Sequence, residues 1–241
     1  MGNQVSSMFP FWYYYDPTWI VLLPALVLAL YAQAKVTATF ERFLRVPARV
    51  GLSGAEVARE ILRMNGIYDV TVEMTRGRLT DYYDPRTKVL RLSPEVYNGR
   101  SLAAIGVAAH ECGHAIQHNI GYAPLALRNT IVPLAGIGSQ MAFPLFFLGL
   151  LLSSEFLATL GILFFSAAVL FQLITLPVEY NASSRAVAAL ENAGFISYEE
   201  EGPVRSVLNA AALTYVAATL MAILQLLRLI ALFGIYNRDD R

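Results

Sequence analysis

The hydrophobic pattern divides the chain into long uncharged runs and shorter segments that mix polar and apolar residues. Four runs lack Asp, Glu, Lys and Arg: residues 17–34, 131–152, 156–176 and 207–227. About 20 helical residues cross a hydrocarbon layer about 30 Å thick, so the last three runs are long enough to span a bilayer and the first is marginal. We expect a mostly α multi-pass membrane protein with about four transmembrane helices. The alternative, a set of buried helices in a soluble protein, would need a much larger body around runs of this length.

The distribution of positive charge predicts the orientation. Residues 35–130 hold 13 of the 18 Lys and Arg residues, and residues 1–34 hold none. The positive-inside rule therefore places residues 35–130 in the cytoplasm, with an aromatic-rich N-terminus outside and a first transmembrane helix within residues 1–34. Residues 131–176 then form a transmembrane hairpin, and residues 177–206 return to the cytoplasm. Residues 207–241 form a fourth transmembrane helix and a tail.

Composition supports this class of protein. The chain is 56% hydrophobic and 15% charged, whereas soluble domains are about 25% charged. Lys and Arg balance Asp and Glu at 18 each, so no basic excess points to nucleic acid. The lipid bilayer is the expected environment, and the single cysteine, Cys112, excludes an internal disulfide.

Residues 35–130 have the pattern of a small α+β subdomain. Ser53 and Glu56 form a capping-box pattern at a helix start, and Gly66 suits the end of that helix. Ser101 is a candidate cap for a later helix. The pattern predicts two helices and two short strands: residues 55–64, 102–118, 70–74 and 89–92.

The second of these helices carries the chemistry. All three histidines of the chain lie in it, and two belong to His110-Glu111-Cys112-Gly113-His114, an HExxH pattern. Histidines four residues apart share a helix face, so both imidazoles can bind one Zn²⁺. Glu111 points away from the metal but stays near a zinc-activated water, as a general base would. We expect one zinc ion per chain.

A catalytic zinc site needs three protein ligands and an open position. His118 is a poor third ligand because helical geometry rotates it about 80° from His110. Gln117 stands where the HExxHxxGxxH pattern requires glycine, which excludes the metzincin arrangement. The third ligand should therefore be an acid on the same side of the membrane. Glu179, directly after the third uncharged run, is the best candidate; the alternative is an interfacial residue that caps a helix after Pro177.

These residues resemble a known family. HExxH followed by Glu179-Tyr180-Asn181-Ala182-Ser183 is similar to the HExxH…ExxxD pattern of membrane gluzincins, the group of HtpX and the CAAX prenyl proteases. A closer resemblance is to the YugP-like neutral zinc metallopeptidases of bacterial membranes, carried by residues 81–93, 108–118, 121–125 and 176–186. The resemblance implies a zincin-like subdomain, His110, His114 and Glu179 as zinc ligands, and Glu111 as general base.

The resemblance also has implications for the surroundings of the metal. Ser183 stands where the gluzincin pattern has Asp, so Ser183 or Asn181 would support a ligand histidine. Arg185 would pair with a substrate carbonyl or with Glu179. Independently of the resemblance, we expect His118 to lie near the ligands or on the surface, or to contact substrate. An edge strand beside the site would bind an extended substrate through its main chain; the residues predicted for it are Val89, Leu90, Arg91 and Leu92. A simple packing strand fits these four residues equally well.

The leading hypothesis is a zinc endopeptidase in a bacterial plasma membrane, with its active site on the cytoplasmic side. It would hydrolyse peptide bonds of membrane or membrane-proximal proteins. The alternative is a non-catalytic, zinc-binding membrane scaffold or regulatory partner. An intramembrane protease and a channel or transporter are further alternatives, which the position of the acid motif below a span and the scarcity of charge inside the spans argue against.

Overall fold

Four long helices dominate the computed structural model, which describes residues 17–239. The predicted aromatic N-terminus before residue 17 and the last two residues of the tail lie outside the described residues. Four helical segments are long and apolar enough to cross a membrane: Thr18–Leu44, Ala123–Leu151, Glu155–Asn192 and Tyr198–Tyr236. Each contains all or nearly all of one of the uncharged runs, so the prediction of a mostly α protein with about four spans is confirmed.

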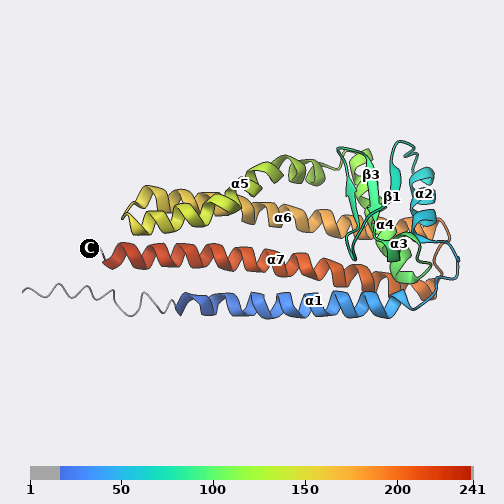
Figure 1. The fold of residues 1–241 in the computed structure, drawn as a ribbon, viewed down its shortest axis with the longest axis horizontal. Helices are drawn as coiled ribbons and strands as arrows, with labels where there is room; N and C mark the ends of the chain where they lie inside the picture. Colours follow the sequence, from blue (N-terminus) through green and yellow to red (C-terminus); the bar gives the residue numbers. More distant parts are fainter. Residues whose placement is uncertain (1–16, 240–241) are drawn as a thin grey trace, which may run out of the picture.

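The helices form an elongated bundle with the α+β subdomain at one end (Figure 1). The long helices are α1 (Leu23–Leu44), α5 (Ala123–Leu151), α6 (Glu155–Asn192) and α7 (Tyr198–Asp239), and a short 3₁₀ helix, η2 (Pro17–Leu22), precedes α1. Helices α5 and α6 form the predicted hairpin. Added Cβ atoms at Gly149 and Gly161 would stand only 2.3 Å and 2.6 Å from backbone nitrogens of the partner helix, so these two glycines allow the close packing.

The subdomain follows the predicted local signals. Ser53 and Glu56 form a complete capping box at the start of α2 (Gly54–Met64). The Ser101 side chain accepts a hydrogen bond from the Ala104 backbone at the start of α4 (Leu102–Asn119). These caps satisfy backbone N–H groups that the first turn of a helix leaves without partners. A four-residue helix, α3 (Pro94–Tyr97), precedes α4.

The sheet has three strands in the order β1-β3-β2. β1 (Thr71–Met74) pairs parallel with β3 (Val89–Leu92), and β2 (Tyr82–Asp84) pairs antiparallel with the other side of β3. The prediction that Val89–Leu92 forms an edge strand is therefore wrong. A strand at the centre of a sheet forms main-chain hydrogen bonds with two neighbouring strands. This central position agrees with the burial of Val89, Leu90 and Leu92.

The main hydrophobic core lies in the subdomain and includes the ends of α6 and α7. Helix α4 crosses α6 at Gly113 and Ala182, where an added Cβ at Gly113 would stand 2.4 Å from the Ala182 carbonyl oxygen. Only a residue without a side chain permits this approach. The crossing places the HExxH motif directly against the helix that carries Glu179.

Candidate zinc site and active site

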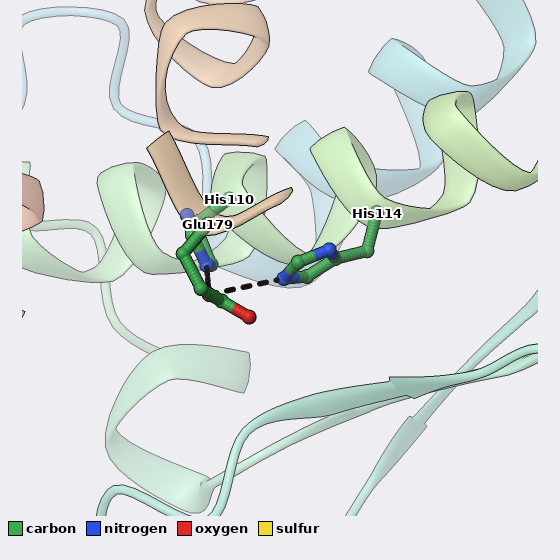
Figure 2. Close-up of side chains that lie close together, drawn as sticks. All are labelled: His110, His114 and Glu179. Atoms are coloured by element: carbon green, nitrogen blue, oxygen red, sulfur yellow. Dashed lines mark ion pairs between the residues drawn. The ribbon is translucent and has the colours of Figure 1, made fainter. Parts of the chain in front are cut away.

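His110 and His114 lie one turn apart on α4, on the face that meets α6. Most of α4 is buried, and both imidazoles are mostly covered as well. The third residue, Glu179, lies within α6, which continues without a break through Pro177. Glu179 therefore does not cap a helix start, and the structure brings it to the two histidines. Figure 2 shows the three side chains converging from the two helices.

The distances among the three side chains suit a single metal ion. Glu179 Oε2 lies 3.3 Å from His110 Nε2 and 3.4 Å from His114 Nε2. Ligand atoms that bind zinc at about 2.0–2.1 Å in tetrahedral geometry lie about 3.3–3.4 Å from one another. The ligand atoms of all three residues fall within 4.8 Å of one another. The arrangement therefore has the size of a zinc site.

Neighbouring polar groups set the tautomer of His114. Gln117 donates its Nε2 to the Val178 carbonyl oxygen at 2.8 Å and to Asn181 Oδ1 at 3.0 Å. Its Oε1, 3.0 Å from His114 Nδ1, can only accept, so His114 Nδ1 carries the proton. The lone pair of His114 Nε2 then points toward Glu179. This is the hydrogen-bond pattern that orients metal-binding histidines in proteins.

His110 has an equivalent support from α6. Its Nδ1 lies 3.1 Å from Ser183 Oγ, which accepts the Nδ1 proton when Nε2 binds a metal. Ser183 thus contacts His110, a candidate ligand, from the position where the gluzincin pattern has Asp. Asn181, the other predicted support, acts indirectly because it contacts Gln117 rather than a ligand.

The three facing atoms are suited to hold a cation among them. Glu179 Oε2 is buried, and among the described residues it accepts no hydrogen bond. The lone pair of His114 Nε2 points toward this oxygen, and His110 Nε2 does the same when its Nδ1 donates to Ser183. Facing acceptor atoms in a buried site repel one another unless a cation lies between them. Zinc fits the donor set of two imidazoles and one carboxylate.

Glu111 lies beside the three candidate ligands in a small cavity. The cavity measures about 130 Å³ and is lined by the ligands, Glu111 and residues of β2 and α5. The Glu111 side chain is almost fully buried, and this burial raises its pKa to about 7, while a hydrogen bond from the Tyr83 backbone opposes the increase. A carboxylate with a pKa near neutrality is suited to accept and release a proton at physiological pH.

Arg128 is a site residue that the sequence reasoning missed. It lies in the second turn of α5, and its guanidinium donates to Glu179 Oε1 at 3.2 Å. One carboxylate oxygen of Glu179 is thus held by Arg128 while the other faces the histidines. Tyr215 of α7 also lines the cavity. One feature of the sequence could have indicated Arg128: it is the last charged residue before the second uncharged run.

The structure places the other predicted residues away from the three ligands. His118 contacts the Tyr83 hydroxyl through Nδ1 at 2.8 Å and borders a separate cavity. Arg185 donates to Asn181 at 2.7 Å, and Arg128 rather than Arg185 pairs with Glu179, which was one of the two roles left open for Arg185. The strand that borders the candidate active site is β2, an edge strand.

The fold and the site define a membrane protein with a zinc site of the metallopeptidase type. The chain belongs to the family described as "Putative neutral zinc metallopeptidase", whose model matches residues 18–234. It is 53% identical over 218 residues to "Putative membrane protease YugP" of Bacillus subtilis (strain 168), an alignment that covers 90% of this chain and 96% of that protein. No solved structure matches the chain. The resemblance to this family and the zinc cofactor predicted from the sequence are confirmed.

Proposed function

We propose that this protein is a zinc endopeptidase of the gluzincin type, with His110, His114 and Glu179 as zinc ligands. Zinc bound there would supply a Lewis acid that polarises a peptide carbonyl and acidifies a water molecule. The observation that carries the proposal is the convergence of three acceptor atoms on one point, beside a buried carboxylate, in one cavity. The family and the name of the relative support a protease.

The residues around the cavity take distinct roles in this proposal. Glu111 accepts a proton from the attacking water and delivers it to the leaving amine nitrogen, for which a pKa of about 7 is suited. Arg128 and Tyr215 border the same cavity and offer donors to the developing negative charge on the carbonyl oxygen. Arg185, which the sequence suggested as a partner for a substrate carbonyl, does not line this cavity.

We propose β2 as the strand that aligns the substrate. It is an edge of the sheet, and Asp81, Tyr82, Tyr83 and Pro85 line the cavity. An extended peptide can add to such an edge through main-chain hydrogen bonds, which gives affinity with little dependence on side chains. The substrate class is then an extended segment of a membrane or membrane-proximal protein.

The site is proposed to face the cytoplasm, because residues 35–130 hold 13 of the 18 Lys and Arg residues. Ser154→Cys, at the tip of the α5–α6 hairpin, tests this orientation. Cys112, the only cysteine of the chain, is buried and would not interfere. A membrane-impermeant maleimide should label the variant in intact cells. Labelling only after lysis would indicate the opposite orientation.

The experiment that tests the proposed function compares zinc content and proteolysis in four versions of the detergent-purified protein. Wild type should carry about one zinc per chain, Glu179→Ala should lose it, and the matched control His118→Ala should keep it. Glu111→Gln should keep zinc but cut an unfolded protein substrate about 10²- to 10⁴-fold more slowly. If Glu179→Ala retains zinc, the assignment of Glu179 as a zinc ligand is wrong. Full zinc loading with no cleavage by wild type would favour the scaffold alternative.

A further inference from the structure

A second, larger cavity opens against the candidate active site on the side of α1 and α7. It measures about 340 Å³. Its walls are mainly apolar and come from three helices and the segment before β2, with Val36 and Phe40 on α1, Val107 on α4, Leu208 and Ala211 on α7, and Leu79 before β2. The two acidic residues of its lining, Asp81 and Glu111, also line the smaller cavity, and the remaining walls carry no acidic or basic side chain except His110, so this part of the cavity suits an apolar occupant.

The larger cavity adjoins the candidate zinc site, with which it shares four lining residues. Asp81, His110, Glu111 and Tyr215 line both cavities. A group that occupies the larger cavity therefore lies beside the general base and one ligand histidine. The polar walls of the smaller cavity, which include Arg128 and Glu179, differ from the apolar walls of the larger one. The two cavities would thus receive different parts of one bound chain.

The position along the helices places the larger cavity near the membrane surface. Gln33 and Val36 line it at the point where the uncharged run of α1 ends, and Leu208 to Tyr215 line it where the uncharged run of α7 begins. Helices α1 and α7 lie side by side there (Figure 1). A polypeptide that leaves the apolar layer next to these helices meets the cavity as it reaches the zinc site.

We infer that this cavity is the specificity pocket for a large apolar side chain, such as Leu or Phe, next to the peptide bond that is cut. The inference rests on the proposed function. Burying such a side chain removes its apolar surface from water, whereas a charged side chain would lose its hydration against the apolar walls that lie away from Asp81 and Glu111. The substrate is accordingly a polypeptide cut at an apolar residue close to the bilayer surface.

The test measures side-chain preference in the zinc-loaded, full-length protein in detergent. A mixture of synthetic peptides with randomised positions is digested, and mass spectrometry identifies the residues that flank each cleaved bond. Wild type should prefer Leu or Phe over Ala at one flanking position by about tenfold or more. Ala211→Phe fills the cavity from α7 and should reduce that preference to about threefold or less. Val36→Phe fills it from α1 and should do the same.

A matched control separates filling of the cavity from a general effect on the helix. Ala218→Phe makes the same change on α7 at an exposed position outside both cavities, and it should keep the wild-type preference. Zinc content and the melting temperature show whether each filled variant is folded. If Ala211→Phe does not fold, Val36→Phe on the opposite wall replaces it in the test.

The outcomes distinguish this inference from the proposed function. Cleavage by wild type without a preference for apolar residues would overturn the assignment of this cavity as a specificity pocket. A preference that survives both Ala211→Phe and Val36→Phe would do the same. The cavity would then hold another group, such as a lipid acyl chain. A complete lack of cleavage by zinc-loaded wild type would overturn the proposed function itself, and the inference with it.

Discussion

Replacing Gly113 by alanine should weaken zinc binding although position 113 does not contact the metal. A Cβ there would stand 2.4 Å from the Ala182 carbonyl oxygen, and real Cβ atoms essentially never approach another heavy atom within 3.0 Å. Helices α4 and α6 must therefore separate by about 0.6 Å, the difference between these distances. Zinc ligands tolerate deviations of only about 0.2 Å. The separation would pull His110 and His114 from Glu179.

The expected magnitude follows from the cost of overpacking. Extra methyl groups in a well-packed region cost about 1–3 kcal/mol, which corresponds to about 5- to 150-fold weaker zinc binding if the strain opposes the closed site. Titration of the detergent-purified variant with zinc against a competing chelator measures this change. Gly136→Ala on α5 is the control, because an added Cβ there meets nothing within 4 Å. If Gly113→Ala binds zinc as tightly as Gly136→Ala, the helix crossing does not position the site as argued.

Three further substitutions test the supports of the site and of the bundle. Ser183→Ala removes the hydroxyl beside His110 Nδ1 and should weaken zinc binding about 10- to 100-fold, while Ser183→Asp should restore it. If wild type and Ser183→Ala bind zinc equally tightly in a chelator titration, Ser183 does not support the site. Gln117→Leu leaves His114 Nδ1 without its acceptor, so zinc affinity should fall by a similar factor and stability by about 1–3 kcal/mol, measured as the melting temperature. Arg228→Met removes the cation–π contact between α7 and η2 and should cost about 0.5–2 kcal/mol of stability, with zinc content unchanged; a loss of zinc would show coupling between the two ends of the bundle.

Local sequence signals predicted the helices of the subdomain and the pairing of the two histidines. The capping residues Ser53 and Ser101 act within a few residues of the helix they start. The HExxH spacing places two imidazoles on one face by helical geometry alone. Such features depend on neighbours in the chain, so a sequence read without any structure can predict them.

Contacts between distant segments account for what the sequence reasoning missed. The position of Val89–Leu92 at the centre of the sheet depends on which strands pair with it, and β1 and β2 approach it from opposite sides. A pattern of buried residues is the same for a central strand and for an edge strand packed on one face. Arg128 was missed for a similar reason, since its partner Glu179 is 51 residues away.

The sequence by itself determined a helical membrane protein, its four uncharged spans and the motif that holds two candidate zinc ligands, because hydrophobic length and helical periodicity are properties of continuous segments. Only the tertiary structure decided how the site is completed. The crossing of α4 and α6 at Gly113 brings Glu179 to the histidines, Gln117 and Ser183 orient the imidazoles, and β2 becomes the edge beside the cavity. These relations join residues far apart in the chain, and packing of the helices against one another sets their distances.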